Sequence, residues 1–255
     1  MDFVQSVILG IVEGITEFLP ISSTGHLILT SYLLGLKQTD FLKSFEIAIQ
    51  LGAILSIVFL YWKSLFLKWA VIKRVIIAFI PTAILGVIFY SIFKDYLLNK
   101  TIVLWALFLG GIFLIIFELF HKEKERGIGE ISDMPPMKAF YIGIFQAIAI
   151  IPGVSRAAAT IVGGLFLGLR RKTIVEFSFL LAVPTMLSAT AFDLFKSANE
   201  FSFDQIEFLI VGFITSFIVA IVSVKFLLYF IRSHSFISFG IYRIALTIFF
   251  WLIIL

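Results

Sequence analysis

The sequence has no cysteine and few charged residues. The absence of cysteine among 255 residues excludes disulfides and thiolate chemistry. Only 14% of the residues are charged, whereas soluble domains carry about 25%. Hydrophobic residues make up 61%, and the mean hydropathy is +1.11. We therefore expect a polytopic integral membrane protein, and we read the net charge of +4 through the loops rather than as a nucleic-acid-binding surface.

A cleavable signal pattern is also missing. Asp2 stands where a basic segment would begin, and no small-residue cleavage site precedes the first polar stretch. We expect the first apolar segment to belong to the folded protein.

Two carboxylates stand out in the stretch EGITEFLPISSTGH, residues 13–26. Glu13 and Glu17 are four residues apart and would share one face of a helix. Pro20 stops or kinks that helix. Each charge at the bilayer centre costs about 2.5–3.5 kcal/mol, so such residues in a membrane indicate function. A structural alternative is that they only hold the broken helices together.

The same stretch contains hydroxyls and an imidazole. Ser22, Ser23 and Thr24 precede His26, and a Ser23–His26 contact is expected if a helix restarts there. Together with the carboxylates, these residue types supply a base, a nucleophile and a proton carrier.

Residues 3–12 and 27–35 are apolar but shorter than the roughly 20 residues that a membrane span needs. With the polar break between them, they predict a re-entrant helix–loop–helix hairpin whose tip faces a polar cavity. Residues 139–168 repeat this pattern around Pro152-Gly153. Six spans are expected, at residues 44–62, 75–93, 101–120, 174–195, 207–230 and 239–255.

The two halves of the chain match each other. Pro20 aligns with Pro152 and Phe45 with Phe177, both offset by 132 positions. We therefore predict two repeats, residues 1–126 and 135–255, each with one hairpin and three spans, within one membrane domain. Three crossings per half invert the second repeat, so the hairpins enter from opposite faces. The predicted fold class is an all-α integral membrane protein with six transmembrane helices and two re-entrant hairpins.

Loop charges predict the orientation. The larger basic set has twelve members, Lys63, Lys68, Lys73, Arg74, Lys122, Lys124, Arg126, Lys138, Arg170, Arg171, Lys172 and Arg232. The smaller set has five, Lys37, Lys43, Lys94, Lys100 and Lys196. The positive-inside rule places the larger set in the cytoplasm, so both termini and the first hairpin face outward.

Arg156 follows the Pro152-Gly153 break at the expected start of a helix. A helix N-terminus and a guanidinium both suit phosphate, and Ser155 and Thr160 add hydroxyl donors. Alternatively, Arg156 is only an ion-pair partner of Glu17. Three further polar residues lie in apolar runs: Gln50 and Gln146 fit either function or helix packing, and Arg243 is expected to cap the cytoplasmic end of its span.

The segments EGITEFLPISSTGH and PGVSRAAAT (152–160) closely resemble the two signature motifs of the bacterial undecaprenyl pyrophosphate phosphatase family, the bacitracin-resistance type. The resemblance covers essentially the whole chain. It implies hydrolysis of undecaprenyl diphosphate to the monophosphate at the outer face of the cell membrane, which recycles the lipid carrier for peptidoglycan. It also implies dependence on Mg²⁺ or Ca²⁺.

Carried over by position, Glu13 and Glu17 resemble the family's acidic pair, which would also hold the metal, and Ser23 and His26 resemble its catalytic residues. Ser155, Arg156 and Thr160 resemble the pyrophosphate-binding set, and Ser22 and Thr24 are further substrate-binding candidates. The family usually has Ser and Gly where this chain has Ala157 and Ala158, so one hydroxyl is missing.

Several alternatives stay open at this point. Attack by Ser23 and direct attack by water are both compatible with the residues. Inverted repeats with broken helices also occur in secondary transporters and would suit a polyprenyl-phosphate flippase, and opposed hairpins could form a channel filter. The expected partners are a polyprenyl diphosphate lipid and the membrane, and a homodimer is compatible with the sequence.

Overall fold

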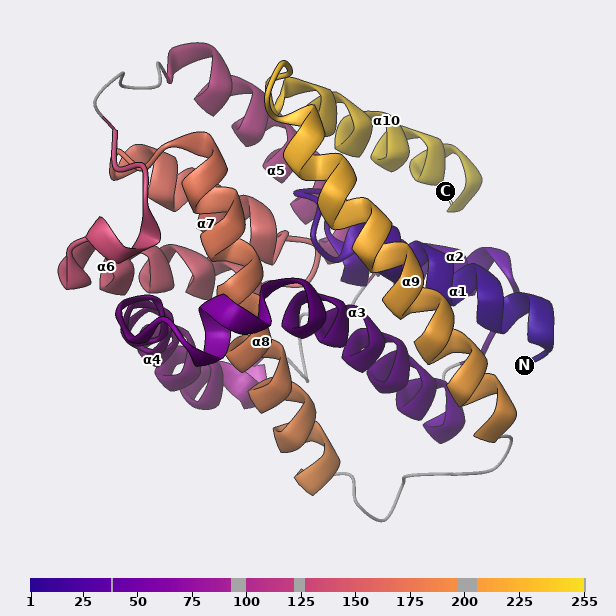
Figure 1. The fold of residues 1–255 in the computed structure, drawn as a ribbon. Coiled ribbons are helices and arrows are strands. Elements are labelled where there is room, and N and C mark those ends of the chain that lie inside the picture. Colours follow the sequence, from indigo (N-terminus) through magenta and orange to yellow (C-terminus); the bar gives the residue numbers. More distant parts are fainter. Residues whose placement is uncertain (38, 93–99, 122–126, 197–205, 255) are drawn as a thin grey trace.

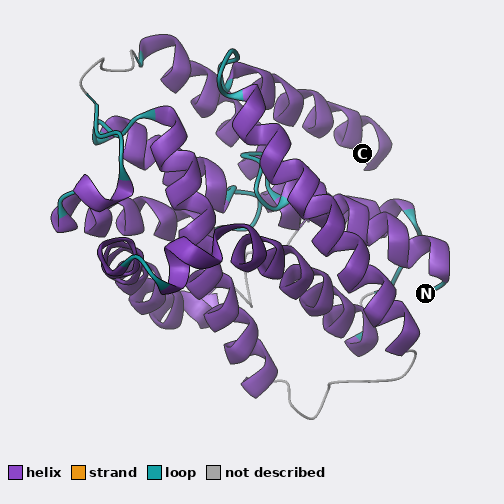
Figure 2. Cartoon of the chain, viewed as in Figure 1, coloured by secondary structure: helices purple, strands orange, loops and turns teal. Residues whose placement is uncertain are grey.

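A computed structural model describes residues 1–37, 39–92, 100–121, 127–196 and 206–254. These residues form α-helices joined by loops, with one isolated bridge between Ile128 and Leu169 (Figures 1 and 2). The α-helices are α1 (Phe3–Thr16), α2 (Ser23–Leu33), α3 (Asp40–Phe66), α4 (Trp69–Ile92), α5 (Lys100–Phe120), α6 (Pro136–Ala147), α7 (Arg156–Phe166), α8 (Arg171–Lys196), α9 (Ile206–Phe230) and α10 (Ile237–Ile254).

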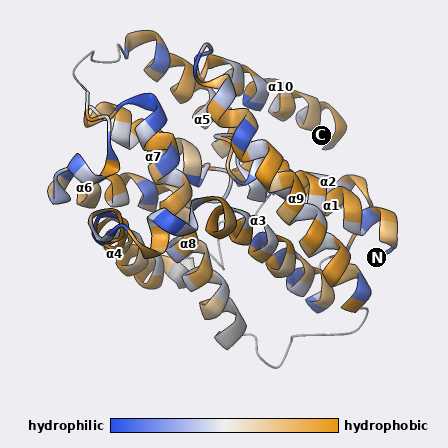
Figure 3. Cartoon of the chain, in the orientation of Figure 1, coloured by the Kyte–Doolittle hydropathy of each residue, from blue (hydrophilic) through white to orange (hydrophobic). Residues whose placement is uncertain are grey.

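Among the described residues, five helices are long and apolar enough to cross a membrane: α3, α4, α5, α8 and α9. They correspond to the first five expected spans. The sixth expected span corresponds to α10, which is shorter than these five helices. The outer surface of the bundle is largely apolar along α4, α9 and α10 (Figure 3). Side chains such as Trp69, Phe120 and Leu252 are among the most exposed. An all-helical, multi-pass membrane protein is thereby confirmed.

The first hairpin consists of α1, a break at residues 17–22, and α2. Asp2 caps α1 by accepting from the backbone N–H of Gln5 at 2.8 Å. The helix continues to Thr16, beyond the expected end at residue 12. It stops there because Pro20 has no N–H to donate to the carbonyl of Thr16 and disfavours helical geometry at the preceding residue.

The second hairpin consists of α6, a short 3-10 turn at Ile148–Ile150, a break, and α7. Gly153 has a φ of +91°, and a Cβ there would lie 2.6 Å from the carbonyl oxygen of Val103. Glycine therefore fits this turn where other residues would not. Ser155 caps α7 by accepting from the N–H of Ala158 at 3.1 Å, so Arg156 is the first residue of the helix, as expected.

Small residues bring the first helix of each hairpin close to a helix of the other half. A Cβ at Gly14 on α1 would lie 2.8 Å from the carbonyl oxygen of Ser216 on α9. A Cβ at Gly143 on α6 would collide with the carbonyl oxygen of Ala78 on α4. Thus α1 packs on α9 and α6 packs on α4. Each half of the chain therefore packs a hairpin helix against a long helix of the other half. The division into two repeats stays a prediction.

The two hairpins open toward opposite ends of the bundle. At the start of α5, the ammonium of Lys100 lies 3.9 Å from the ring centre of Tyr32, near the end of the first hairpin. Near the other end of α5, Glu118 forms a 2.6 Å ion pair with Arg171, which follows the second hairpin. At 1.5 Å per residue these two contacts are about 27 Å apart along α5. That separation is close to the roughly 30 Å thickness of the hydrocarbon core.

Several described segments that carry residues of the larger basic set contact one another. Arg74 donates to the carbonyl of Met134 at 3.0 Å, and the Ile128–Leu169 bridge joins the central loop to the end of the second hairpin. The grouping of these basic residues on one side is therefore consistent with the packing. Lys94, Lys122, Lys124 and Arg126 lie outside the described residues.

Candidate functional site

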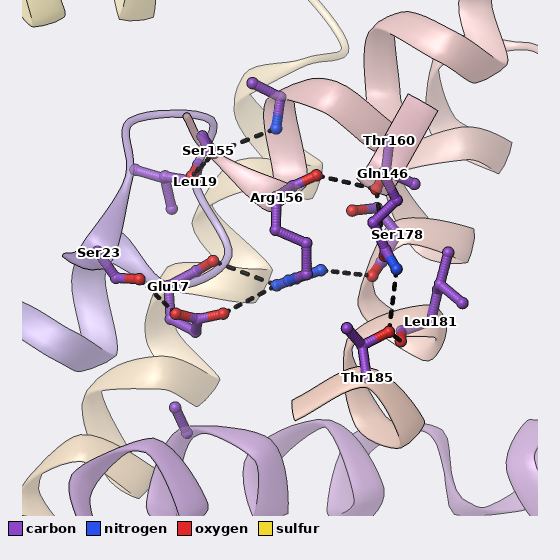
Figure 4. Close-up of polar contacts among 12 residues, drawn as sticks. Glu17, Leu19, Ser23, Gln146, Ser155, Arg156, Thr160, Ser178, Leu181 and Thr185 are labelled. Carbon is purple, nitrogen blue, oxygen red and sulfur yellow. Dashed lines mark hydrogen bonds and ion pairs between the residues drawn. The ribbon is translucent and has the colours of Figure 1, made fainter. Parts of the chain in front are cut away.

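The breaks of the two hairpins meet in the interior of the bundle (Figure 4). The guanidinium Nη2 of Arg156 donates to Oε1 of Glu17 at 3.0 Å and to the Glu17 carbonyl at 3.3 Å. Ser155 Oγ lies 3.5 Å from the carbonyl oxygen of Leu19. The side chains of Arg156 and Glu17 are only 12% and 6% exposed. Removing either partner of such a pair typically costs about 3–5 kcal/mol, because the other charge stays buried.

Ser23 shares the same carboxylate. Its Oγ donates to Oε2 of Glu17 at 2.5 Å, a length typical of a charge-assisted O–H···O⁻ bond. Glu17 thus lies between a hydroxyl and a guanidinium that each bind one of its oxygens. A nucleophile bonded to a base that a third group orients is the arrangement of an activated nucleophile.

Most of the donor capacity of Arg156 is used inside the protein. Besides Glu17, it donates through Nη1 to the carbonyl of Ser178 at 2.9 Å. A guanidinium has five N–H groups, so three are engaged. Its Nε is buried without a hydrogen-bond partner among the described residues. Arg156 therefore binds Glu17 directly and contributes its charge to the lining of the site.

A cavity of about 240 Å³ lies where the breaks meet. It is smaller than the roughly 300–1,000 Å³ pockets that enclose drug-sized ligands, so it suits a headgroup rather than a whole lipid. Six predicted site residues are in its lining: Glu17, Ser22, Ser23, Thr24, Ser155 and Arg156. The other described lining residues are Gln50, Ala149, Val154, Met186 and Ala189.

Glu13 and Thr160 lie behind this lining. Glu13 is 0% exposed, and neither of its carboxylate oxygens has a hydrogen-bond partner among the described residues. Thr160 is also 0% exposed, and its hydroxyl donates to the carbonyl of Arg156 at 2.8 Å. The structure therefore brings Thr160 to the backbone of Arg156 rather than to the cavity.

The expected Ser23–His26 contact is not made among the described residues. The hydroxyl of Ser23 is bound by the charged Glu17, a stronger acceptor than a neutral imidazole. His26 instead uses Nδ1 to contact the carbonyl oxygen of Ser22 at 2.7 Å and Nε2 to contact the hydroxyl of Tyr242 at 2.8 Å. This part of the prediction was wrong.

The expected role of Arg243 was also wrong. It does not cap the end of α10 but lies within the helix and is 1% exposed. Its guanidinium donates to the carbonyls of Ala106, Leu107 and Gly153 at 3.0–3.2 Å. Three backbone acceptors compensate the buried charge. Arg243 thus joins α10 and α5 to the break of the second hairpin.

The two glutamines have different roles. Gln146 is buried and donates to Thr82 at 2.9 Å and Thr185 at 3.0 Å, so it joins α6 to α4 and α8. Gln50 lines the cavity from α3. The sequence left both roles open for Gln50 and gave no indication of a role for Tyr242. A lone amide in an apolar run indicated a special role for Gln50. A tyrosine in an apolar helix is common and indicated no such role for Tyr242.

The alanines that depart from the family pattern face the protein interior. Ala157 is 1% exposed and belongs to the hydrophobic core, and Ala158 is 8% exposed. Neither is among the residues that line the cavity. The missing hydroxyl at position 157 therefore removes no donor from this lining.

The fold and the site together define a multi-pass helical membrane protein with a buried serine–carboxylate–arginine centre. Residues 6–249 match the family model described as bacitracin resistance protein BacA. The chain belongs to this family. It is 57% identical to the undecaprenyl-diphosphatase of Sulfurihydrogenibium sp. over 99% of each chain, and 54% identical to that of Aquifex aeolicus over 95% and 94%. The undecaprenyl-diphosphatase of Persephonella marina is 53% identical over the full length of both chains.

Proposed function

We infer that this chain hydrolyses undecaprenyl diphosphate to undecaprenyl phosphate and inorganic phosphate. This reaction recycles the lipid carrier of peptidoglycan synthesis and gives bacitracin resistance. Family membership and the names of relatives at 45–57% identity support this activity. The observation that carries the mechanism is the 2.5 Å bond from Ser23 to Glu17 inside a cavity that also contains Arg156.

In the proposed reaction, Ser23 Oγ attacks the terminal phosphorus while its proton passes to Glu17. The bond between that phosphorus and the bridging oxygen breaks, and the lipid monophosphate leaves. Glu17 passes this proton to the departing lipid monophosphate and becomes a carboxylate again. Water then attacks the phosphoserine and gives a proton to Glu17, which returns it to Ser23 Oγ as that P–O bond breaks and inorganic phosphate leaves. Arg156 keeps Glu17 oriented, and its positive charge stabilises the charge that develops on the phosphoryl oxygens.

The diphosphate is held by groups from both hairpins. The first hairpin offers the hydroxyls of Ser22 and Thr24, and the second offers Ser155 and the N-terminus of α7, which favours anions. His26 and Thr160 support this set from behind, through Ser22 and Arg156. The isoprenoid tail extends from the small cavity along apolar spans.

A divalent cation would be held mainly by the substrate. Among the described residues there is no group of three or more His, Asp or Glu side chains that could hold a metal. Glu17 lines the cavity and keeps lone pairs beyond its two bonds, whereas Glu13 lies behind it. This fits Mg²⁺, which commonly binds one or two carboxylates together with substrate phosphates. The ion would neutralise phosphate charge, so an excess of chelator should abolish turnover, and full activity in chelator would exclude the metal.

We also propose six spans, with α10 as the sixth, and two re-entrant hairpins in the bacterial cell membrane. The larger basic set would be cytoplasmic, and the first hairpin would open outward. A cysteine at Lys37 should then react with an impermeant thiol reagent in intact cells, and one at Asp133 only after lysis. The opposite labelling would overturn the orientation. A homodimer stays a prediction.

Phosphate release tests the activity directly. Purified protein should release phosphate from a polyprenyl diphosphate, and Ser23→Ala should lower kcat by about 10³-fold or more. Thr24→Ala is the comparison variant, because it removes a proposed diphosphate-binding hydroxyl of the same cavity that does not bond Glu17; it should raise KM without a comparable loss of kcat. A flippase or a channel would bind the lipid or conduct ions without releasing phosphate, so a protein that releases none would contradict the proposal.

A further inference from the structure

Both ring nitrogens of His26 contact groups other than Ser23 and Glu17. Nδ1 lies 2.7 Å from the carbonyl oxygen of Ser22, and Nε2 lies 2.8 Å from the hydroxyl of Tyr242. The rings of His26 and Tyr242 are stacked, with centres 5.6 Å apart and an angle of 4° between planes. Tyr242 lies on α10, 216 residues away in the sequence.

The contact of Nδ1 requires a proton on that nitrogen. A carbonyl oxygen can only accept, so Nδ1 of His26 carries the proton. In a neutral imidazole the other nitrogen is an acceptor, so Nε2 accepts from the Tyr242 hydroxyl. With Nδ1 donating and Nε2 accepting, neither nitrogen is directed at Ser23, which is bound to Glu17.

The Ser22 carbonyl that His26 holds belongs to a strained residue. Ser22 has a φ of +72°, and among the described residues it is the non-glycine residue with a positive φ. Such a conformation costs on the order of 1–3 kcal/mol and persists only when its surroundings hold it. The N–H of Gly25 contacts Ser22 Oγ at 3.4 Å, which is long for a hydrogen bond. The backbone N–H of His26 also donates to the Ser22 carbonyl, at 3.2 Å. The ring contact of His26 at 2.7 Å is the shortest of these three restraints, and it acts on the residue directly before Ser23.

We propose that Tyr242 is a positioning residue for the nucleophile. Its hydroxyl fixes the His26 tautomer, His26 holds the Ser22 carbonyl, and the strained Ser22 sets the position of Ser23 against Glu17. In this arrangement His26 is not the base of the reaction. It acts as a brace, by which we mean that its ring holds the Ser22 carbonyl while Tyr242 holds the ring. The inference rests on the proposed function, because it explains how the serine of that reaction is aligned.

Tyr242→Phe keeps the stacked ring and removes only the hydroxyl. We expect kcat to fall on the order of tenfold, because a misplaced nucleophile loses reactive geometry. KM should stay within about twofold, since no group that binds the diphosphate is lost. Tyr229→Phe on α9 is the matched control, because that side chain is 72% exposed and does not line the cavity. A Tyr242→Phe enzyme indistinguishable from this control would overturn the proposal.

Nitrogen-15 NMR of histidine-labelled protein gives a readout independent of activity. With His121 and His234 replaced by asparagine, the His26 ring should be neutral with its proton on Nδ1. Tyr242→Phe should shift the Nε2 resonance, and a proton on Nε2 in the parent would overturn the brace.

His26→Gln, which can donate and accept but cannot act as a base, should retain measurable turnover. A parent enzyme that releases no phosphate would contradict the proposed function, and the NMR result would still decide whether the brace exists.

Discussion

The two hairpins share a backbone plan but supply opposite charges. Each consists of a helix, a polar break and a second helix, and the breaks meet in one cavity. The first break carries the carboxylate of Glu17 and a run of hydroxyls, whereas the second carries Arg156 at the start of α7. Neither hairpin alone has both the Ser23–Glu17 pair and the guanidinium of Arg156. The site therefore exists only where the two breaks touch.

The turns within the breaks are stabilised differently. The second hairpin uses Gly153, with a φ of +91°, where glycine carries little conformational penalty. The first uses Ser22 at +72°, which needs external support. Adjacent residues on α10 reach both, Tyr242 through His26 and Arg243 through the carbonyl of Gly153. One helix, α10, thus contacts both turns, and the strained turn is next to the proposed nucleophile.

Removing the charge of the second hairpin should have the largest effect. Arg156→Ala should lower kcat by about 10³-fold or more, because Glu17 loses its orientation and the phosphoryl charge loses its counter-charge. It should also destabilise the fold by about 3–5 kcal/mol, since Glu17 stays buried and unpaired. Turnover and thermal unfolding in detergent measure the two effects. Arg156→Lys should rescue poorly, because a point charge cannot bond both Glu17 and Ser178.

A double variant separates catalysis from stability in this pair. Arg156→Ala combined with Glu17→Gln removes both buried charges, so most of the lost stability should return while turnover stays absent. Recovered turnover in the double variant would contradict the proposed roles of both residues.

Exchanging the turn residues should affect the hairpins unequally. Gly153→Ala places a Cβ against the Val103 carbonyl at a positive φ, and we expect a loss of about 1–3 kcal/mol of stability together with much of the activity. Ser22→Gly relieves the strain and loses only a weak cap, so stability should change by about 0.5 kcal/mol or less. Thermal unfolding compares them directly. Equal losses would show that the two turns do not differ as described.

The sequence motifs predicted the two breaks and their opposite charges. The contacts that distant helices make with these breaks were not predictable from the sequence. Proline and glycine marked both breaks, and complementary charges at Glu17 and Arg156 indicated that the breaks would meet. Tyr242 and Gln50 lie in apolar helices, where sequence does not show which side chains turn inward until the packing is known. The predicted Ser23–His26 contact was wrong because the spacing of two residues does not show which other acceptors compete for the serine hydroxyl. Glu17 is the stronger acceptor and binds it instead.

Gln50 is a candidate for binding the diphosphate from outside the two hairpins. It lines the cavity from α3, and its amide offers two N–H donors to phosphate oxygens. Gln50→Met keeps the length of the side chain and should raise KM about tenfold, the scale of a hydrogen bond to a charged group. Met186→Leu alters the same lining without removing a donor and serves as control. Equal KM values in the two variants would assign Gln50 to packing.

The smallest effect is expected where the second hairpin departs from the family pattern. Ala157→Ser restores the usual residue, but position 157 faces the core and not the cavity. Its kcat and KM should therefore stay within about twofold of the parent values. A large gain in activity would show that this position takes part in binding phosphate.

The central claim is that Ser23, activated by Glu17 and aligned with Arg156, takes up the phosphoryl group. Rapid mixing of the enzyme with a polyprenyl diphosphate, acid quenching and peptide mass spectrometry measure this directly. The account predicts one phosphoryl group on Ser23 within the first turnover, and none in the Ser23→Ala variant. Phosphate release at the full rate with no phosphoserine at any quench time would contradict it and assign the attack to water.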